Sequence, residues 1–346
     1  FKHINDRYGH LAGDALIQEV ARRLCRIAGD AEMVARLGGD EFAILLRYRN
    51  DLRIADRLQA MVEEMRRPFE LLGNQAHAGI SIGVALTPHC GADRTELMRK
   101  ADIALYRAKG EGRDCYRFFS EEMDETVQLR ASLETDLRKA LANGQELEVH
   151  YQPQVDARSG AVTGLEALLR WNHPQRGQVP PSQFVPIAEE TGLISALGDL
   201  VLRDACAVAR SRPLQRVAVN LSAVQFRDEG LPQHIAAILA EEGVTPDRIE
   251  LEVTEGVLLD DSDMVHAMLR RLRAMGFAIA LDDFGTGYSS LSYLRKFEVD
   301  RIKIDKSFVQ RLGSHADAEA IVTAVITLGH AMGLKVTAEG VETVEQ

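Results

Sequence analysis

The sequence predicts a protein of the mixed α/β class, built from a small first domain and a larger second domain joined by a helix. Its length of 346 residues exceeds what one ordinary hydrophobic core organises. Helix-spaced and strand-like apolar patterns alternate in the first third, and seven further strand-like segments follow, with helical stretches between most of them. Repeated strand–helix units are typical of parallel strands, and this many units predict a barrel.

The first domain is expected over residues 1–119. Apolar residues recur at helical spacing over 14–28. Two short apolar runs then flank Gly38-Gly39-Asp40, which is the pattern of a β-hairpin. The remaining elements complete a compact α/β domain, with the hairpin strands at 33–37 and 41–46, helices at 52–67 and 94–109, and strands at 78–86 and 115–119.

Residues 120–142 predict a solvent-exposed connecting helix. They are polar, rich in helix-forming residues and free of Gly and Pro, with only a thin apolar stripe. Asn143-Gly144 ends the helix in a common way.

The second domain is expected over 143–346 as a barrel of the (β/α)8 type. An eight-stranded barrel needs one strand more than the sequence supplies, so we expect the last strand and helix to lie beyond Gln346. The chain also opens without Met, so we expect it to be a piece of a longer protein that is truncated at both ends. The predicted strands run at 147–155, 162–170, 216–221, 248–253, 277–282, 300–304 and 334–338.

Composition and charge exclude several classes of function. The net charge is −11 and there is no Lys/Arg-rich tract, which argues against binding to a nucleic-acid polymer. No apolar run approaches the roughly 20 residues that span a bilayer, and the start does not resemble a signal peptide. The four cysteines are scattered without a C-x-x-C pair, as expected of reduced thiols. We expect a cytoplasmic location, with any membrane or sensory segment outside this sequence.

Polar side chains stand at or near the carboxyl ends of six successive strands of the second domain. In a barrel these ends share one face, where such folds build their active sites. Any one carboxylate of this kind has an ordinary alternative as a loop residue in water, but six successive strands favour a shared site. The residues are Glu166, Asn220, Glu252, Asp282 with Asp283, Lys303 with Asp305, and Glu339 with Glu342.

The adjacent carboxylates Asp282 and Asp283 need a positive partner, because like charges side by side raise one another's pKa. So many converging carboxylates predict a pair of divalent cations. Oxygen ligands without His or Cys favour Mg²⁺ or Mn²⁺ over zinc. Two such ions about 3.5–4 Å apart would clamp a phosphodiester and activate a bridging water. Lys303 would orient that water or stabilise charge on phosphorus, although it can also be read as an ordinary surface lysine.

The loop after Asp283 carries Gly285 and Gly287, which let the backbone turn sharply. Ser289 and Glu255 are candidates for pinning this loop by hydrogen bonds. A plain helix N-cap is an equally good interpretation of Ser289.

The second domain resembles the EAL domain, a cyclic di-GMP phosphodiesterase with a modified TIM-barrel fold. The motifs "YQPQVD", "EALLRW", "NLS", "EVTE", "DDFGTGYSSL", "KIDKSF" and "AEGVE" stand in that family's order. The resemblance implies substrate contacts at Gln152 and Arg170, a water-positioning role for Lys303, and a loop latch formed by Glu255 and Ser289. It implies metal ligands at Glu166, Asn220, Glu252, Asp282 and Glu339, with Asp283 and Asp305 bordering the same cluster.

The first domain resembles the GGDEF domain of diguanylate cyclases, which implies a small palm-like fold of the nucleotide-cyclase type. The motifs "FKHINDRYGHLAGD", "RLGGDEF" and "ADIALYRAKGEGRD" carry this resemblance. It implies that Asp40 and Glu41 hold Mg²⁺ against the phosphates of GTP. Asn5, His10 and Asp14 correspond to guanine and ribose contacts, and Lys109 and Arg113 to phosphate contacts. The family has a further metal-binding Asp four residues before the position of Phe1.

Together the two resemblances predict a protein of cyclic di-GMP turnover. The barrel is expected to hydrolyse cyclic di-GMP to linear pGpG. The GGDEF domain is expected either to bind GTP as a regulator or to condense two GTP into cyclic di-GMP, and the second activity requires a homodimer because each copy supplies one GTP. The alternative is a non-catalytic receptor that binds cyclic di-GMP and signals without cleaving it.

Overall fold

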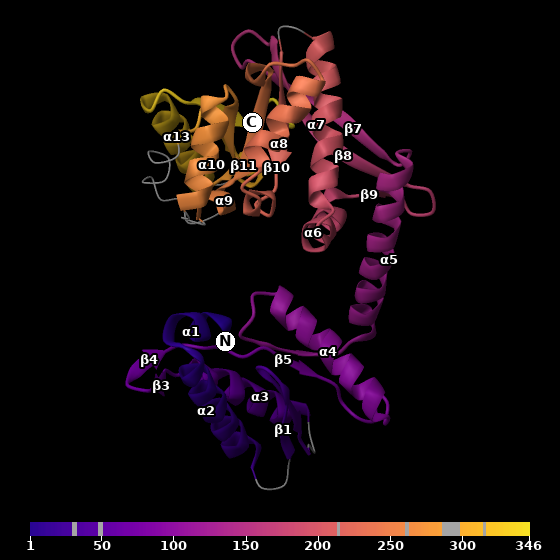
Figure 1. The fold of residues 1–346 in the computed structure, drawn as a ribbon, viewed down its shortest axis with the longest axis vertical. Coiled ribbons are helices and arrows are strands. Elements are labelled where there is room, and N and C mark those ends of the chain that lie inside the picture. The colour runs from indigo at the N-terminus through magenta and orange to yellow at the C-terminus, as the bar shows by residue number, and fades with distance from the viewer. Residues whose placement is uncertain (30–32, 48–50, 213–214, 260–262, 286–297, 314–315) are drawn as a thin grey trace. The chain divides into compact units, whose positions relative to one another are not determined.

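The structure is a computed structural model that describes residues 1–29, 33–47, 51–212, 215–259, 263–285, 298–313 and 316–346 (Figure 1). Its internal contacts divide the chain into two compact units, Phe1–Ala131 and Ser132–Gln346. The division falls inside helix α5 (Glu121–Asn143), the connecting helix expected from the sequence. The domain boundaries at 119 and 143 stay predictions.

The first unit contains the predicted helices and the predicted hairpin. Strands β1 and β2 pair antiparallel, with Gly38 opposite Glu41 at the turn. Helix α1 and the β3–β4 hairpin were not predicted, and the strand expected at 78–86 is shorter because only β5 pairs there, parallel to β6. The elements are α1 (Lys2–Tyr8), α2 (His10–Ala28), β1 (Met33–Gly38), β2 (Glu41–Leu45), α3 (Asp51–Arg66), β3 (Phe69–Leu71), β4 (Asn74–Ala76), β5 (Ile82–Val84), α4 (Arg94–Gly110) and β6 (Tyr116–Phe118).

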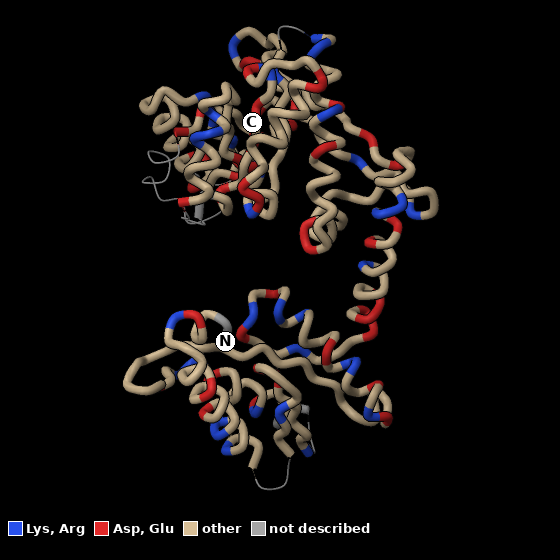
Figure 2. The backbone as a smooth tube through the Cα atoms, viewed as in Figure 1, with Lys and Arg blue, Asp and Glu red and all other residues tan. Residues whose placement is uncertain are grey.

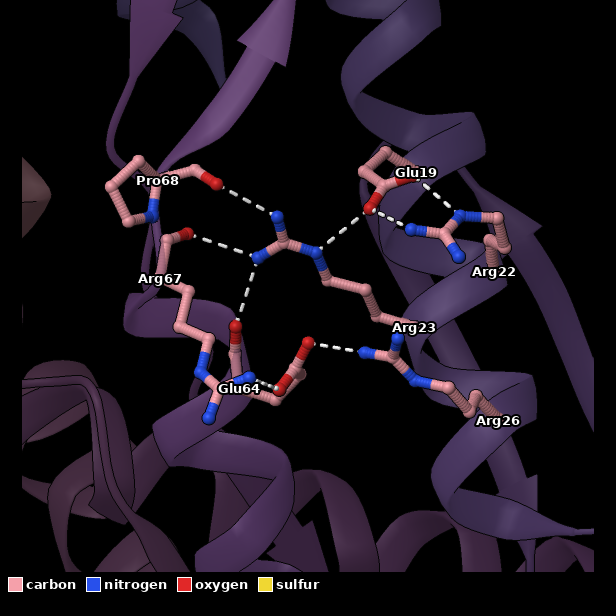
Figure 3. A network of polar contacts seen from close by, with 7 residues as sticks. All are labelled: Glu19, Arg22, Arg23, Arg26, Glu64, Arg67 and Pro68. Atoms are coloured by element: carbon pink, nitrogen blue, oxygen red, sulfur yellow. Dashed lines mark hydrogen bonds and ion pairs between the residues drawn. The ribbon is translucent and has the colours of Figure 1, made fainter.

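Arg23 of α2 fastens the end of α3 to the core of this unit (Figure 3). Its side chain is buried, and its guanidinium lies 3.9 Å from the centre of the Phe69 ring. Nη1 donates to the carbonyl oxygens of Glu64 and Arg67 at 2.9 Å each, and Nη2 donates to that of Pro68 at 2.8 Å. These carbonyls lie in the last turn of α3 and just beyond it, where the carbonyl groups of a helix have no backbone N–H within the helix to bond to. One buried cation therefore caps the helix.

The second unit is built on one long sheet whose strand order is β7-β8-β10-β11-β12-β13-β14, with β9 added beside β8. All seven predicted strands are present within a few residues of their predicted bounds. The elements are β7 (Leu147–Val155), β8 (Val162–His173), β9 (Gly177–Val179), α6 (Pro181–Thr191), α7 (Ile194–Ser211), β10 (Arg216–Leu221), α8 (Leu231–Glu241), β11 (Ile249–Thr254), α9 (Glu255–Leu259), α10 (Asp263–Ala274), β12 (Ala278–Phe284), β13 (Arg301–Ile304), α12 (Lys306–Val309), α13 (Ala316–Ala331) and β14 (Lys335–Ala338), with 3-10 turns at Gln225–Arg227 and Pro246–Arg248.

Strand β8 and strands β10 to β14 pair in parallel, as the strand–helix units predicted, whereas the added strand β9 pairs antiparallel with β8. The first pair corrects that expectation, because β7 and β8 run antiparallel. Their connection, residues 156–161, is too short for the crossover that a parallel pair requires. The result is a modified (β/α) barrel. The eighth strand expected beyond Gln346 stays a prediction.

Side chains alternate across the barrel wall. On β11, Ile249, Leu251 and Val253 belong to the hydrophobic core between sheet and helices. Glu250 and Glu252 therefore point to the opposite face, the barrel interior, because successive strand residues face opposite sides. The same alternation on β13 places Ile302 and Ile304 in the core. Polar side chains of these strands thus point into the barrel interior, and their apolar side chains pack against the helices outside it.

Acidic and basic residues are interspersed along both units (Figure 2), in keeping with the modest net charge of −11. Among the helices in the described part of the chain, none combines the length and the apolar character that crossing a bilayer requires.

Candidate active site

Lys303 is the centre of the polar cluster in the barrel. Its side chain is only 1% exposed. Four carboxylates of the described residues surround its ammonium nitrogen Nζ. Glu252 Oε2 lies at 2.6 Å, Glu339 Oε1 at 2.7 Å, Asp282 Oδ1 at 3.2 Å and Glu166 Oε2 at 3.3 Å. Glu252 lies on β11, Asp282 on β12, Glu166 on β8 and Glu339 directly after β14, so the cluster joins four separate strands around β13. The structure therefore brings the predicted residues together.

The charges in this cluster do not balance. Burial alone would lower the pKa of Lys303, but Glu252 and its neighbours more than offset this, so the pKa is raised and the side chain is an ammonium. Burial is the main cause that raises the pKa of Glu252 and of Glu339, with Lys303 acting in the opposite direction. One ammonium faces four carboxylates, so the site has an excess of negative charge that invites further cations.

A bulge brings Asp283 to the same cluster as Asp282. Regular alternation would point the two side chains to opposite faces. The register between β12 and β13 shifts here, so that both residues stand opposite Lys303 alone. Asp283 takes a left-handed backbone conformation, with φ of 54°, and its N–H donates to Asp282 Oδ1 at 2.9 Å. Burial, Asp282 and Asp305 raise the pKa of Asp283.

The donor set fits a divalent cation. Asp282, Asp283 and Glu339 each offer one carboxylate oxygen, and these three atoms lie within 4.8 Å of one another. Asn220 lies beside Glu166, with its Nδ2 donating to Glu166 Oε1 at 3.4 Å. Carboxylate oxygens and the amide oxygen of Asn220 are the kind of ligand that Mg²⁺ and Mn²⁺ prefer. Three of the metal residues predicted in the barrel are therefore close enough to share one cation, and the full ligand set stays a prediction.

The predicted substrate residues flank this cluster. Gln152 stands directly opposite Glu166 in the antiparallel β7–β8 pair, so both side chains face the same side. Arg170 lies four residues further along β8 on that side, and its Nη1 donates to the Leu169 carbonyl at 3.0 Å. Asp305 caps the N-terminus of α12 by accepting from Ser307 N at 2.9 Å.

Two predictions at the rim have a different outcome. Glu342 is exposed after β14 and is not among the described carboxylates that contact Lys303. Glu255, the first residue of α9, is 7% exposed. Its predicted partner Ser289 and the loop glycine Gly287 lie outside the described residues. The latch therefore stays a prediction.

In the first unit, Asp40 and Glu41 lie at the exposed tip of the β1–β2 hairpin. Gly39 adopts φ of 50°, which a glycine tolerates better than other residues. Its carbonyl accepts from Arg36 Nη2 at 2.7 Å, which fixes the turn. Both carboxylates face solvent and are accessible to a cation.

The predicted guanine and phosphate contacts lie on helices of the same unit. Asn5 is on α1, whereas His10 and Asp14 are exposed one turn apart on α2. Lys109 and Arg113 are exposed at and just beyond the last turn of α4. Within the described ranges, no hydrogen bond or ion pair joins these groups to one another or to the hairpin tip. Their joint action in nucleotide binding stays a prediction.

Sequence reasoning missed a second polar layer inside the barrel. Glu250 and Arg301 form an ion pair there, with Arg301 Nε 2.9 Å from Glu250 Oε1. Arg301 Nη1 also donates to Thr337 Oγ1 at 2.8 Å. The signal was present, because these three residues stand two positions before Glu252, Lys303 and Glu339 and so share their face.

Comparison with family models matches both halves of the chain. Residues 134–346 match the EAL domain, and residues 1–115 match the diguanylate cyclase GGDEF domain.

Curated relatives match over the whole chain. An uncharacterized signaling protein of Caulobacter vibrioides is 49% identical over 350 residues, which cover 100% of this chain and 43% of that protein. The bifunctional diguanylate cyclase/cyclic di-GMP phosphodiesterase MucR of Pseudomonas aeruginosa is 43% identical over 351 residues, covering 100% of this chain and 51% of MucR. The chain thus spans about half the length of the curated relatives it matches.

A solved structure agrees with these matches. The structure described as the PaMucR phosphodiesterase in complex with c-di-GMP superposes with a TM-score of 0.59 at 45% identity, covering 62% of this chain and 88% of that one. Fold, motif order and matched length agree. The chain therefore belongs to the EAL-domain family and carries a GGDEF domain in its first third.

Proposed function

We propose that the barrel hydrolyses cyclic di-GMP to linear pGpG with the help of two Mg²⁺ or Mn²⁺ ions. The observation that carries this proposal is the convergence of Glu166, Glu252, Asp282 and Glu339 on the single ammonium of Lys303. The similarity to the MucR phosphodiesterase supports the choice of substrate. The residues proposed to hold the ions are these four carboxylates together with Asn220 and Asp283.

The charge of the site explains why cations are needed for binding as well as for chemistry. Each phosphodiester of cyclic di-GMP carries a negative charge, and the carboxylate cluster is negative too. Substrate and site would repel one another at such short range without intervening positive charge. When bound, Mg²⁺ or Mn²⁺ ions lower the pKa of a coordinated water and stabilise charge on a phosphate oxygen.

The side chains divide the remaining work. Lys303 is held as an ammonium by its carboxylate neighbours, so it donates hydrogen bonds and does not accept a proton. It is placed to orient the attacking water or to stabilise charge that develops on phosphorus. Gln152 and Arg170, on the same side of β7 and β8, hold the substrate beside the cluster. The water loses a proton as its oxygen bonds to phosphorus, the bond to the sugar 3′-oxygen breaks, and that oxygen takes up a proton, so one water is divided between the new 5′-phosphate and the free 3′-hydroxyl.

The GGDEF domain is proposed to bind GTP, either as a regulator of the barrel or as the substrate of a cyclase. Asp40 and Glu41 would hold Mg²⁺ at the exposed hairpin tip. Condensation of two GTP needs two copies of the domain face to face, so the cyclase activity implies a homodimer.

The rival function is a receptor that binds cyclic di-GMP without cleaving it. Incubation of the purified chain with cyclic di-GMP and Mn²⁺, with and without GTP, separates the two by the pGpG formed. Hydrolysis that disappears in Asp282→Asn supports the phosphodiesterase. The matched control is Asp199→Asn, which removes a carboxylate whose Oδ1 pairs with His234 Nε2 at 2.7 Å and leaves the Lys303 cluster intact. Tight binding with no pGpG from the unaltered chain contradicts the proposal.

The cyclase is tested in the Asp282→Asn background, where any product accumulates. GTP with Mg²⁺ should yield cyclic di-GMP in this background, and Asp40→Asn should abolish it. Asp56→Asn, an exposed Asp on α3, is the matched control. Binding of GTP without product supports the regulatory role instead.

A further inference from the structure

Beneath the Lys303 cluster lies a second set of contacts with the same plan. In the upper set, Lys303 of β13 reaches Glu252 of β11 and Glu339 after β14. In the lower set, Arg301 of β13 reaches Glu250 of β11 and Thr337 of β14. Each lower residue precedes its upper counterpart by two positions, a rise of about 6.6 Å along a strand. The two sets therefore stack inside the barrel.

The lower ion pair is costly to place, so its presence needs an explanation. Barrel interiors are ordinarily filled by branched apolar side chains. Glu250 is 2% exposed and the Arg301 side chain 12%. Removing such charges from water costs several kcal/mol per ion, and apolar residues of similar size often stabilise as well or better. Stability alone is thus a weak reason for an ion pair at this position.

The geometry of β12 allows the pair to form. Strand β12 lies between β11 and β13, so Arg301 must reach across it. Ala280 of β12 stands opposite Arg301 on one side and opposite Glu252 on the other, and Ala278 stands opposite Glu250. Both alanines are buried. A larger side chain on this face would occupy the path of the guanidinium.

The strands that Arg301 ties together are also those with the shortest contacts to Lys303. Among the described residues, Lys303 Nζ lies 2.6 and 2.7 Å from the carboxylates delivered by β11 and β14. Its distances to the carboxylates of β12 and β8 are 3.2 and 3.3 Å, and the described side-chain contacts of Arg301 are with β11 and β14 instead. The tight part of the upper cluster coincides with the lower clamp.

We propose that Arg301 is a positioning residue for the phosphodiesterase, which it serves by clamping β11 and β14 to β13 through Glu250 and Thr337. The clamp sets the separation of Glu252, Lys303 and Glu339, and hence the geometry in which the metal ions and the attacking water are held. This inference rests on the proposed function of the barrel. A guanidinium suits the task because Nη1 donates a directed hydrogen bond to Thr337 while the charge lies against Glu250, 2.9 Å from Nε but without hydrogen-bond geometry.

Arg301→Met tests the clamp by removing the guanidinium while keeping an unbranched side chain. The concentration of Mn²⁺ for half-maximal binding, measured by calorimetry, should rise about tenfold, and kcat should fall about 10- to 100-fold, the range typical when residues behind metal ligands are lost. The KM for cyclic di-GMP should stay within about threefold, because Gln152 and Arg170 lie on strands that the clamp does not hold. Arg216→Met is the matched control. This arginine is the exposed first residue of β10, and its side chain donates to the Asp247 carbonyl.

A double variant separates positioning from folding. Glu250→Met combined with Arg301→Met removes both buried charges and should recover the stability that Arg301→Met alone loses. Positioning predicts that kcat and Mn²⁺ affinity stay low in this stable variant. Recovery of both together with stability would overturn the proposal, and so would unaltered kcat and Mn²⁺ affinity in Arg301→Met.

Two further variants keep the test decisive. Thr337→Val removes one of the two clamp contacts without changing size and should lower kcat about threefold. Arg301→Lys keeps the charge beside Glu250 but not the guanidinium's hydrogen bond to Thr337, so it should rescue only part of the activity. A wild-type chain that binds Mn²⁺ but forms no pGpG contradicts the proposed function. In that case the Mn²⁺ affinity of Arg301→Met still decides the inference, because weaker binding supports the clamp and equal binding refutes it.

Discussion

Replacement of Lys303 by Met is the perturbation that most sharply tests the electrostatics of the site. The side chain is 1% exposed and its ammonium lies within 3.3 Å of four carboxylates of the described residues. Lys303→Met leaves these carboxylates without their common cation. Breaking a buried ion pair from one side costs about 3–5 kcal/mol. We therefore expect the barrel to lose about 3–5 kcal/mol of unfolding free energy when divalent cations are chelated.

The chain supplies its own reporter for this measurement. It has one tryptophan, Trp171, which is fully buried on β8 and packs edge-on against Phe184 at 5.8 Å between ring centres. Urea unfolding followed by tryptophan fluorescence thus reports on the barrel. With a slope of about 3 kcal/mol per molar urea, the loss corresponds to a midpoint lower by 1 M or more. Lys335→Met, at an exposed position of β14, is the matched control and should leave the midpoint in place.

Divalent cations complete the test. If bound ions supply the missing positive charge, saturating Mg²⁺ should restore a large part of the stability lost in Lys303→Met. An equal loss with and without Mg²⁺, or a loss below about 1 kcal/mol, would refute the reasoning that the carboxylates depend on local positive charge.

Three other predictions follow from the described contacts. Burial and neighbouring carboxylates raise the pKa of Glu252, Asp283 and Glu339, so the metal-free barrel loses stability as pH rises through these raised pKa values and the groups ionise. Mg²⁺ should therefore raise the urea midpoint more at pH 8 than at pH 5.5. A larger effect of Mg²⁺ at pH 5.5 would contradict this sign. Glu166→Gln should lower hydrolysis at least about 100-fold while leaving the metal-free urea midpoint unchanged or higher, because it removes one of several crowded carboxylates; a large drop in that midpoint would instead indicate a structural role. Arg23→Met should cost the first unit about 2–3 kcal/mol, because three carbonyl groups at the end of α3 lose their donor (Figure 3); calorimetric unfolding checks this against Arg22→Met, an exposed neighbour whose loss should cost about 1 kcal/mol or less.

The architecture was largely predictable because it follows from periodicity. Strand-like runs separated by helical stretches specify parallel pairing, and the carboxyl ends of parallel strands meet at one edge. That rule was enough to predict that Glu166, Glu252, Asp282 and Glu339 meet near Lys303. It failed at the first pair, where a six-residue connection between β7 and β8 forces an antiparallel turn.

The finer geometry of the site depends on features that periodicity does not encode. Alternation alone separates Asp282 from Asp283, and only the bulge opposite Lys303 brings both to one side. From the sequence, metal ions were predicted as the positive partner of these carboxylates. The structure adds that the ammonium of Lys303 lies at the centre of the cluster and contacts Asp282 directly. The clamp formed by Arg301 crosses β12, and such a contact between non-adjacent strands becomes visible only once the strand order is known.

Anomalous diffraction from crystals of the chain soaked with Mn²⁺ and a non-hydrolysable analogue of cyclic di-GMP would locate the cations directly. Two peaks about 3.5–4 Å apart, bounded by the carboxylates around Lys303, are the expected result. Density for the analogue with no anomalous peak at these carboxylates, in crystals whose protein hydrolyses the natural dinucleotide, would contradict a bimetallic centre at this position.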